Sequence, residues 1–337
     1  MALGLGAAAY LWLQRPSPKR VTPPVASTPP PAASTLADPL FPERTAALAA
    51  RAALEPDWVS SGPKAQYQYS WPASKRDGVE PCATPAPDEA KNIRAMSRGF
   101  LFGGGPEAID AEGKFDLVIH FNGEGPVRRE LLASAQPFVL FTYTLPPSDS
   151  YAPHFAGSKL MTRLIEEITM VLERRHGRKV KLGHLALSAW SAGFEGIRSI
   201  LFQREAERVE AILLIDGLHA PRGQTYVANN LAPFVAFARK AAKKERFFAI
   251  THSSIPTYDF ISTTESAHFL EQTLAGKPTR VERNDGFGLE LIEQFDVGDL
   301  HVRGYAGNDK ADHCAQLFLL RSLFTALHRH FHPAPAR

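Results

Sequence analysis

Continuous apolar runs alternate with amphipathic segments from about Met96 onward, and this alternation constrains the fold more than any other feature. The apolar runs cover residues 115–121, 138–143, 180–187, 209–215, 246–251 and 300–305. Between them, helical spacing of apolar residues is clearest over 160–172, before Gly177, and helices are also expected over 194–208 and 314–331. Strands that are apolar on both faces and separated by helices are typical of a parallel sheet covered on both sides. The sequence therefore predicts an α/β fold with a mostly parallel sheet and helices on both faces.

Composition and charge exclude several classes of protein. The chain has 337 residues, of which 44% are hydrophobic, so it can bury a substantial core. Its 38 Lys and Arg against 35 Asp and Glu give a formal charge of +3, too small for the concentrated positive field of a nucleic-acid-binding protein. The two cysteines, Cys82 and Cys314, exclude a four-thiolate zinc site but leave a single disulfide open.

The N-terminal part of the chain differs from the rest. Residues 1–14 are almost wholly apolar but fall short of the roughly 20 residues that span a bilayer. Residues 15–60 are rich in proline and alanine, as expected of an extended linker with one short helix over 42–54. We therefore expect an export signal or anchor remnant (1–14), a linker (15–60) and a folded domain (61–333) whose first strand covers 67–71. The expected location is the cell envelope, with a possible membrane tether; a cytoplasmic enzyme with an apolar N-terminus is the alternative.

Ser191 lies between a predicted strand and a predicted helix, with Ala189 two residues before it and Gly193 two residues after it. This arrangement resembles the nucleophile elbow of the α/β-hydrolase superfamily, where small flanking residues let the strand and the helix approach closely. Ala189 departs from the usual glycine by one methyl group. The resemblance covers about residues 67–331 and implies an α/β-hydrolase-like fold. The short segment between Asp216 and Phe247 leaves room for little or no lid.

The family places an acid and then a histidine after the serine, and this chain has candidates in that order. His313, in a segment expected to be a loop before the last helix, matches the general base. Asp216 ends the apolar strand that follows the predicted helix of the nucleophile, and is the favoured acid. Asp259 and Glu265 lie after the next strand, the commoner family position, and stay open as alternatives. Glu265 equally suits a structural role at the start of a helix.

The resemblance also implies an oxyanion hole and a substrate site. The amide of Ala192 is expected to supply one donor, and the amide of Asn122 or Gly123 the other. Their loop resembles the His-Gly type of oxyanion loop, with Phe121 where a glycine is usual. Side chains expected to flank the substrate are those of Trp190, His219 and Tyr258. In contrast, His328, His330 and His332 are expected to form a solvated C-terminal tail.

The function that this resemblance implies is that of a serine hydrolase, of the esterase, lipase or amidase type. Ser191, His313 and a carboxylate would cleave an ester or amide bond through a covalent acyl-enzyme, with no metal and no organic cofactor. The expected substrate is a small molecule or an acyl or peptidyl group. The alternative is a catalytically inactive α/β-hydrolase-like binding or scaffold module of the cell envelope, which the departures at Ala189 and Phe121 and the proline-rich tether favour.

Overall fold

A computed structural model describes residues 93–146, 150–157, 159–257 and 259–334. The expected N-terminal elements, namely the apolar segment 1–14, the linker 15–60, the helix over 42–54 and the strand over 67–71, lie outside the described residues and stay predictions. Cys82 and Tyr258 lie outside them as well. Within the described ranges, no helix combines the length and the apolarity needed to cross a bilayer.

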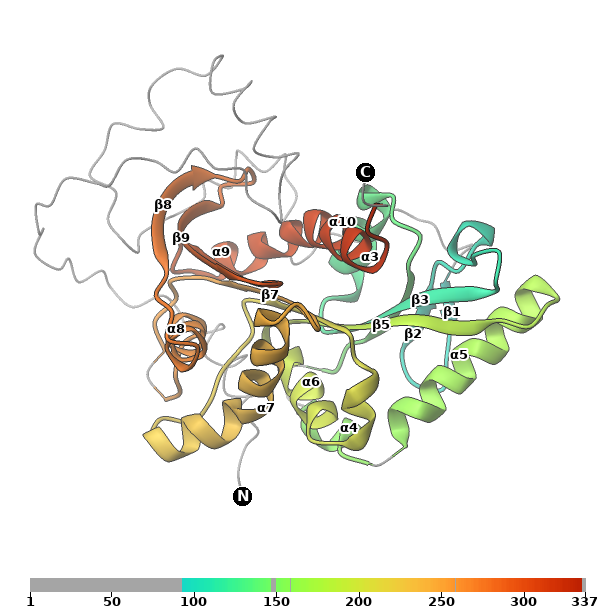
Figure 1. The fold of residues 1–337 in the computed structure, drawn as a ribbon, viewed down its shortest axis with the longest axis horizontal. Coiled ribbons are helices and arrows are strands. Elements are labelled where there is room, and N and C mark those ends of the chain that lie inside the picture. Colours follow the sequence, from blue (N-terminus) through green and yellow to red (C-terminus); the bar gives the residue numbers. More distant parts are fainter. Residues whose placement is uncertain (1–92, 147–149, 158, 258, 335–337) are drawn as a thin grey trace, which may run out of the picture.

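One mixed sheet organises the described residues (Figure 1). Its spatial order is β1-β2-β4-β3-β5-β6-β7-β10-β9-β8. The central strands, from β4 across to β10, pair in parallel. The outer strands pair antiparallel, β1 and β2 at one edge and β9 and β8 at the other. The strands are β1 (Ile93–Ala95), β2 (Phe100–Phe102), β3 (Lys114–Phe121), β4 (Val139–Tyr143), β5 (Lys181–Trp190), β6 (Ala211–Ile215), β7 (Phe247–His252), β8 (Thr279–Asn284), β9 (Glu290–Val297) and β10 (Leu300–Tyr305).

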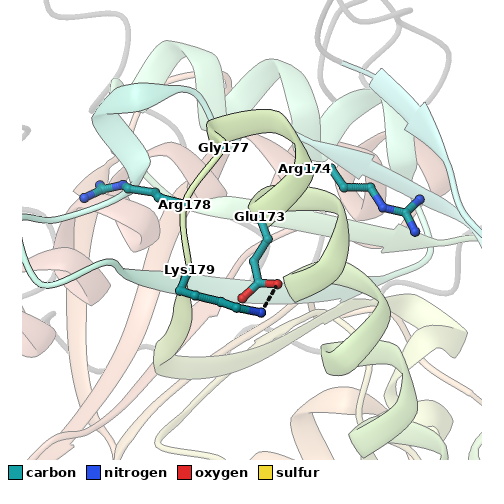
Figure 2. Close-up of a pocket in the computed structure, with 5 residues that line it drawn as sticks. All are labelled: Glu173, Arg174, Gly177, Arg178 and Lys179. Carbon is teal, nitrogen blue, oxygen red and sulfur yellow. Dashed lines mark hydrogen bonds and ion pairs between the residues drawn. The ribbon is translucent and has the colours of Figure 1, made fainter.

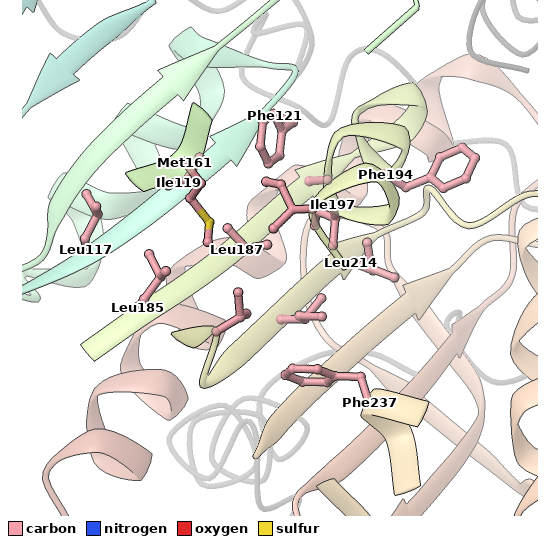
Figure 3. Close-up of a cluster of buried hydrophobic side chains, with 14 of the residues drawn as sticks. Leu117, Ile119, Phe121, Met161, Leu185, Leu187, Phe194, Ile197, Leu214 and Phe237 are labelled. Carbon is pink, nitrogen blue, oxygen red and sulfur yellow. The ribbon is translucent and has the colours of Figure 1, made fainter. Parts of the chain in front are cut away.

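Helices cover both faces of this sheet, and the core lies in the two layers between helices and sheet (Figure 1). One face is covered by α5 (Leu160–His176), α6 (Phe194–Leu201), α7 (Gln224–Ala242) and α8 (Thr263–Thr273), the other by α3 (Glu124–Ser134) and α10 (Leu320–Phe331). Alternate residues of each strand face the two layers. In β3, Leu117 and Ile119 pack toward α5 and α6 (Figure 3). Val118 packs in the other layer, toward α3. The expected fold class is confirmed, because the central strands of the sheet are parallel and are buried on both faces.

The strand order and connections are α/β-hydrolase-like. The chain enters through the antiparallel β2, passes to β3 and then to β4, which lies between them. From there it moves to the other side of β3 and continues outward through β5, β6, β7 and β10. Between β6 and β7 it forms a short loop and then α7, which packs on the sheet through Leu231, Phe234 and Ala238. The segment between β6 and β7 is thus a loop and a helix that packs on the sheet.

Several elements differ from expectation. The helix expected over 194–208 ends at Leu201 and is followed by the 3-10 helix η6 (Arg204–Arg208). The closing helix is divided into α9 (Lys310–Ala315), the 3-10 helix η7 (Gln316–Leu319) and α10. The strands β8 and β9 were not expected, because both are mostly polar and partly exposed and so lack a continuous apolar run.

Two of the three C-terminal histidines, His328 and His330, do not lie in a solvated tail, so that expectation was wrong for them. His328 lies at the end of α10 with its ring 6.0 Å from that of Phe138. His330 pairs with Asp299 at 3.3 Å. His332 hydrogen-bonds Asp116 at 2.6 Å. The amphipathic period of α10 continues to its last residues, so His328 and His330 are partly buried, whereas His332 lies beyond the helix and is exposed.

Candidate active site

Ser191 stands on a tight turn at the carboxyl end of β5 (the η5 helix, Ser191–Gly193). Its φ of +55° is left-handed, a conformation that costs energy for a residue with a side chain. A Cβ at Gly193 would lie 2.3 Å from the carbonyl oxygen of Phe121, and one at Gly217 would lie 2.4 Å from the carbonyl oxygen of Ser191. The methyl of Ala189 packs in the buried core instead. The close approaches that this turn requires are thus made at Gly193 and Gly217, and Ala189 is compatible with it.

Asp216 and His313 form a buried pair at the carboxyl edge of the sheet. The Nδ1 of His313 lies 2.7 Å from Oδ2 of Asp216, and Nδ1–H donates to the carboxylate. The other oxygen, Oδ1, accepts from the amide and hydroxyl of Ser253 at 2.8 and 3.0 Å and from the hydroxyl of Thr263 at 2.7 Å. Burial by itself would raise the pKa of Asp216, but His313 and these donors outweigh it and lower the pKa to about 2. The carboxylate is therefore ionised at neutral pH.

His313 lies in the helix α9, whereas the sequence was expected to place it in a loop. A capping box begins this short helix: the side chain of Asp309 accepts from the amide of Asp312, and the side chain of Asp312 accepts from the amide of Asp309. The ring of Trp190 stacks on the His313 ring with centroids 4.6 Å apart, and Trp190 Nε1 donates to the His313 carbonyl. Because Trp190 directly precedes Ser191, this contact places His313 beside the serine turn. The Nε2 of His313 is buried and has no hydrogen-bond partner among the described residues.

A buried histidine orients the expected oxyanion loop. His120 Nε2 donates to the Asn122 carbonyl at 2.6 Å, and the Ser188 hydroxyl donates to Nδ1 at 2.8 Å. Burial lowers the pKa of His120 to about 3, so the ring is neutral and holds this tautomer. The amide of Gly123 belongs to the same planar peptide as the Asn122 carbonyl and therefore points away from His120. The amide of Asn122 itself donates to the Tyr143 carbonyl at 3.1 Å. Of the two expected donors, Gly123 is thus the better placed.

The two alternative acids lie elsewhere. Glu265 is the third residue of α8, where its carboxylate accepts from the amide of Ser262 and pairs with Arg222 at 3.0 Å. Asp259 is exposed and lies on a bend of the loop after β7. The carboxylate that contacts His313 is that of Asp216.

Among the expected flanking residues, Trp190 and His219 lie near the pair, and Tyr258 lies outside the described residues. His219 follows Asp216 by three residues and is nearly buried. Sequence reasoning missed Ser253 and Thr263, because nothing local marks a serine and a threonine as partners of a carboxylate 37 and 47 residues away. It could have found the Asp309-x-x-Asp312 capping spacing, which is a local signal.

Other candidate sites lie away from this edge. Within the described ranges, no three His, Cys, Asp or Glu side chains are arranged to hold a metal ion. An open surface pocket at the C-terminal end of α5 is lined by Glu173, Arg174, Gly177, Arg178 and Lys179 (Figure 2). The pocket residues precede the ten-residue strand β5 in the chain, whereas Ser191 follows this strand. Since such a strand spans about 30 Å, the pocket belongs to the opposite edge of the sheet.

No family model matches the chain, and no curated protein matches it. A matching solved structure is that of YbtT, a type II thioesterase from the yersiniabactin NRPS/PKS biosynthetic pathway, at 14% identity and a TM-score of 0.29. The match covers 68% of this chain and 97% of that one. At this identity and TM-score, the likeness assigns neither a family nor a function to this chain.

Proposed function

We propose that this protein is a serine hydrolase that cleaves an ester or amide bond through Ser191, His313 and Asp216. The Ser191 hydroxyl attacks the carbonyl carbon while His313 Nε2 takes its proton. The amides of Ala192 and Gly123 bind the oxyanion of the tetrahedral intermediate. His313 then gives the proton to the leaving group, and water activated by the same nitrogen hydrolyses the acyl-enzyme. Asp216 holds the imidazole in the required tautomer and stabilises its positive charge.

The observation that carries this proposal is the state of the two His313 nitrogens. Nδ1–H donates a hydrogen bond to the buried, ionised carboxylate of Asp216, at 2.7 Å. Nε2, which must then be the basic nitrogen, is buried without a partner among the described residues. A buried polar atom without a partner costs free energy, and a catalytic role is one explanation for such an atom in a native fold. The His313 ring also stacks on Trp190, which directly precedes Ser191, and Ser191 has a strained backbone conformation.

The substrate we propose is a small molecule or an acyl or peptidyl group, handled without a metal or an organic cofactor. The proposed location is the cell envelope, with the N-terminal segment as a possible membrane tether. One observation supports an oxidising compartment: Cys314, next to His313, is disulfide-bonded. Disulfides persist mainly in exported proteins.

Labelling with a fluorophosphonate probe tests the catalytic proposal directly. The wild-type chain should be labelled, and Ser191→Ala should abolish both labelling and hydrolysis of a short-chain p-nitrophenyl ester. Ser134→Ala is the matched control, because this serine ends α3 and donates to the Leu131 carbonyl. An unlabelled wild-type chain would favour the binding or scaffold module, and undiminished turnover in Ser191→Ala would contradict the role of this serine.

A further inference from the structure

His219 is held through one ring nitrogen and open at the other. Its Nδ1 lies 3.1 Å from the Ile261 carbonyl oxygen. Since a carbonyl only accepts, Nδ1 carries the proton. The side chain retains 7% exposure, and Nε2 is neither hydrogen-bonded among the described residues nor closed off from solvent. The small exposed part of this ring therefore includes an unsatisfied nitrogen.

The ring has a fixed orientation. The rings of Phe194 and Phe260 contact it edge to face, with centroids 5.7 and 4.9 Å away. The segments that carry His219 and Ile261 are joined by a backbone hydrogen bond of 2.9 Å from the Ile261 amide to the Ala220 carbonyl. Nε2 is thus presented from a rigid support rather than from a swinging side chain.

The ring is neutral at physiological pH. Burial lowers the pKa of His219 to about 4, and this effect outweighs the opposing influences of the Ile261 carbonyl and Asp216. In the neutral tautomer that donates from Nδ1, Nε2 has a lone pair and no proton. It can accept a hydrogen bond but cannot donate one.

This nitrogen belongs to the same edge of the sheet as the candidate catalytic residues. His219 lies three residues after Asp216, in the loop whose Gly217 is in close contact with the Ser191 backbone. Phe194, which contacts the His219 ring, directly follows the serine turn. The His219 ring is therefore close to the serine turn, where a substrate of Ser191 would lie.

We propose that His219 Nε2 accepts a hydrogen bond from a hydroxyl or amide N–H of the substrate, close to the scissile carbonyl. The proposed substrates are thus esters or amides that carry a hydroxyl or an amide N–H near the scissile carbonyl, rather than plain alkyl esters. This inference rests on the proposed function. It assigns His219 a role in specificity and none in the proton transfers.

Hydrolysis of three p-nitrophenyl esters, which share one leaving group, tests this proposal. The esters are the butyrate, the 2-hydroxybutyrate and the 3-hydroxybutyrate. His219→Asn can keep a donor toward Ile261 but removes the outward acceptor, whereas His219→Gln can keep an acceptor near the position of Nε2. His332→Asn is the control, because His332 bonds Asp116 at the opposite edge of the sheet. The readout is the ratio of kcat/KM between a hydroxy ester and butyrate, in which a general loss of activity cancels.

The wild type and His332→Asn should prefer one of the hydroxy esters by about threefold to tenfold, as one neutral hydrogen bond allows. The ratio should fall to about one in His219→Asn and be partly kept in His219→Gln. A wild-type ratio of one for both hydroxy esters, or an unchanged ratio in His219→Asn, would overturn the proposal.

A binding measurement separates this inference from the proposed function. In Ser191→Ala labelled with ¹⁵N-histidine, the Nε2 resonance of His219 should shift on addition of the preferred hydroxy acid and not of butyrate. This readout requires no turnover. Equal shifts with both acids would reject the role of His219 even if Ser191 is the nucleophile, and a selective shift would support it even if Ser191 is not.

Discussion

Asp216 is ionised although it is fully buried, because four hydrogen bonds surround its two oxygens. Three of them reach Oδ1 from Ser253 and Thr263, and the fourth joins Oδ2 to His313. Hydrogen bonds to the charged form favour that form, and a partner that becomes cationic favours it further. Such a carboxylate can orient a histidine without taking its proton.

Asp216→Asn is therefore expected to lower kcat for ester hydrolysis by about 10⁴-fold, as loss of the orienting acid does in triad enzymes. Asp259→Asn and Glu265→Gln are the controls and should keep near-native turnover, because neither side chain contacts His313 in the described structure. Steady-state kinetics of the three variants shows which of the three carboxylates orients the histidine. Near-native turnover in Asp216→Asn with collapse in another variant would move the acid to the later loop.

The same substitution has a second signature at acid pH. The pKa of Asp216 is about 2 in the folded chain against an ordinary value of 3.8. A lowered carboxyl pKa contributes stability above the unfolded value, and this contribution, about 2 kcal/mol, is lost as the pH falls from about 4 toward 2. The unfolding free energy of Asp216→Asn, measured by denaturant titration, should thus fall less than that of the wild type over this range.

At the scale of elements, the serine turn is determined by contacts that the five-residue pattern only partly describes. Gly193 approaches the backbone of β3, and Gly217 approaches Ser191 from the loop after β6. The position that departs from the family pattern, Ala189, faces the core, where a methyl group is accommodated. The departure therefore has a structural explanation and does not argue against catalysis.

Gly193→Ala is expected to destabilise the fold by about 1–3 kcal/mol or more and to abolish probe labelling, because its Cβ meets a backbone oxygen that cannot move aside. Ala189→Gly restores the family residue and should keep labelling, with a loss of about 1 kcal/mol from the missing methyl and the added chain freedom. Thermal unfolding and fluorophosphonate labelling measure both effects. Intact labelling in Gly193→Ala would contradict this account of the turn.

The central elements could be predicted from the sequence, and the peripheral ones could not. The strands from β3 to β7, together with β10, are buried on both faces, so each leaves a continuous apolar run. The outer strands β8 and β9 are held by antiparallel pairing and carry polar residues, so they leave no such run. His313 was placed in a loop because α9 has six residues, too few for a periodic signal.

At the scale of the whole molecule, Cys314 is expected to be linked to Cys82, which lies outside the described residues. It is disulfide-bonded and wholly buried in α9, and the sequence contains one other cysteine, Cys82. Peptide mapping without reduction should therefore recover a peptide that joins Cys82 to Cys314.

Reduction should lower the unfolding free energy by about 2–4 kcal/mol, because the crosslink limits the unfolded chain. Denaturant unfolding with and without reductant measures this difference, with Cys82→Ser as the control that should not respond. Two titratable thiols in the native, unreduced chain would contradict this prediction.

The sequence by itself determined the parallel architecture, the position of Ser191 between a strand and a helix, and the order of serine, acid and histidine. These features are local, since burial on both faces and a strand-to-helix turn each leave a pattern within a few residues. Only the tertiary structure decided that Asp216 contacts His313, that Ser253 and Thr263 support it, and that the Gly123 amide is turned away from His120. Asp216 and His313 are 97 residues apart in the chain and meet because β6, β7 and β10 are neighbours in the sheet. That neighbourhood is set by how all the strands pack together, and no local stretch of sequence contains it.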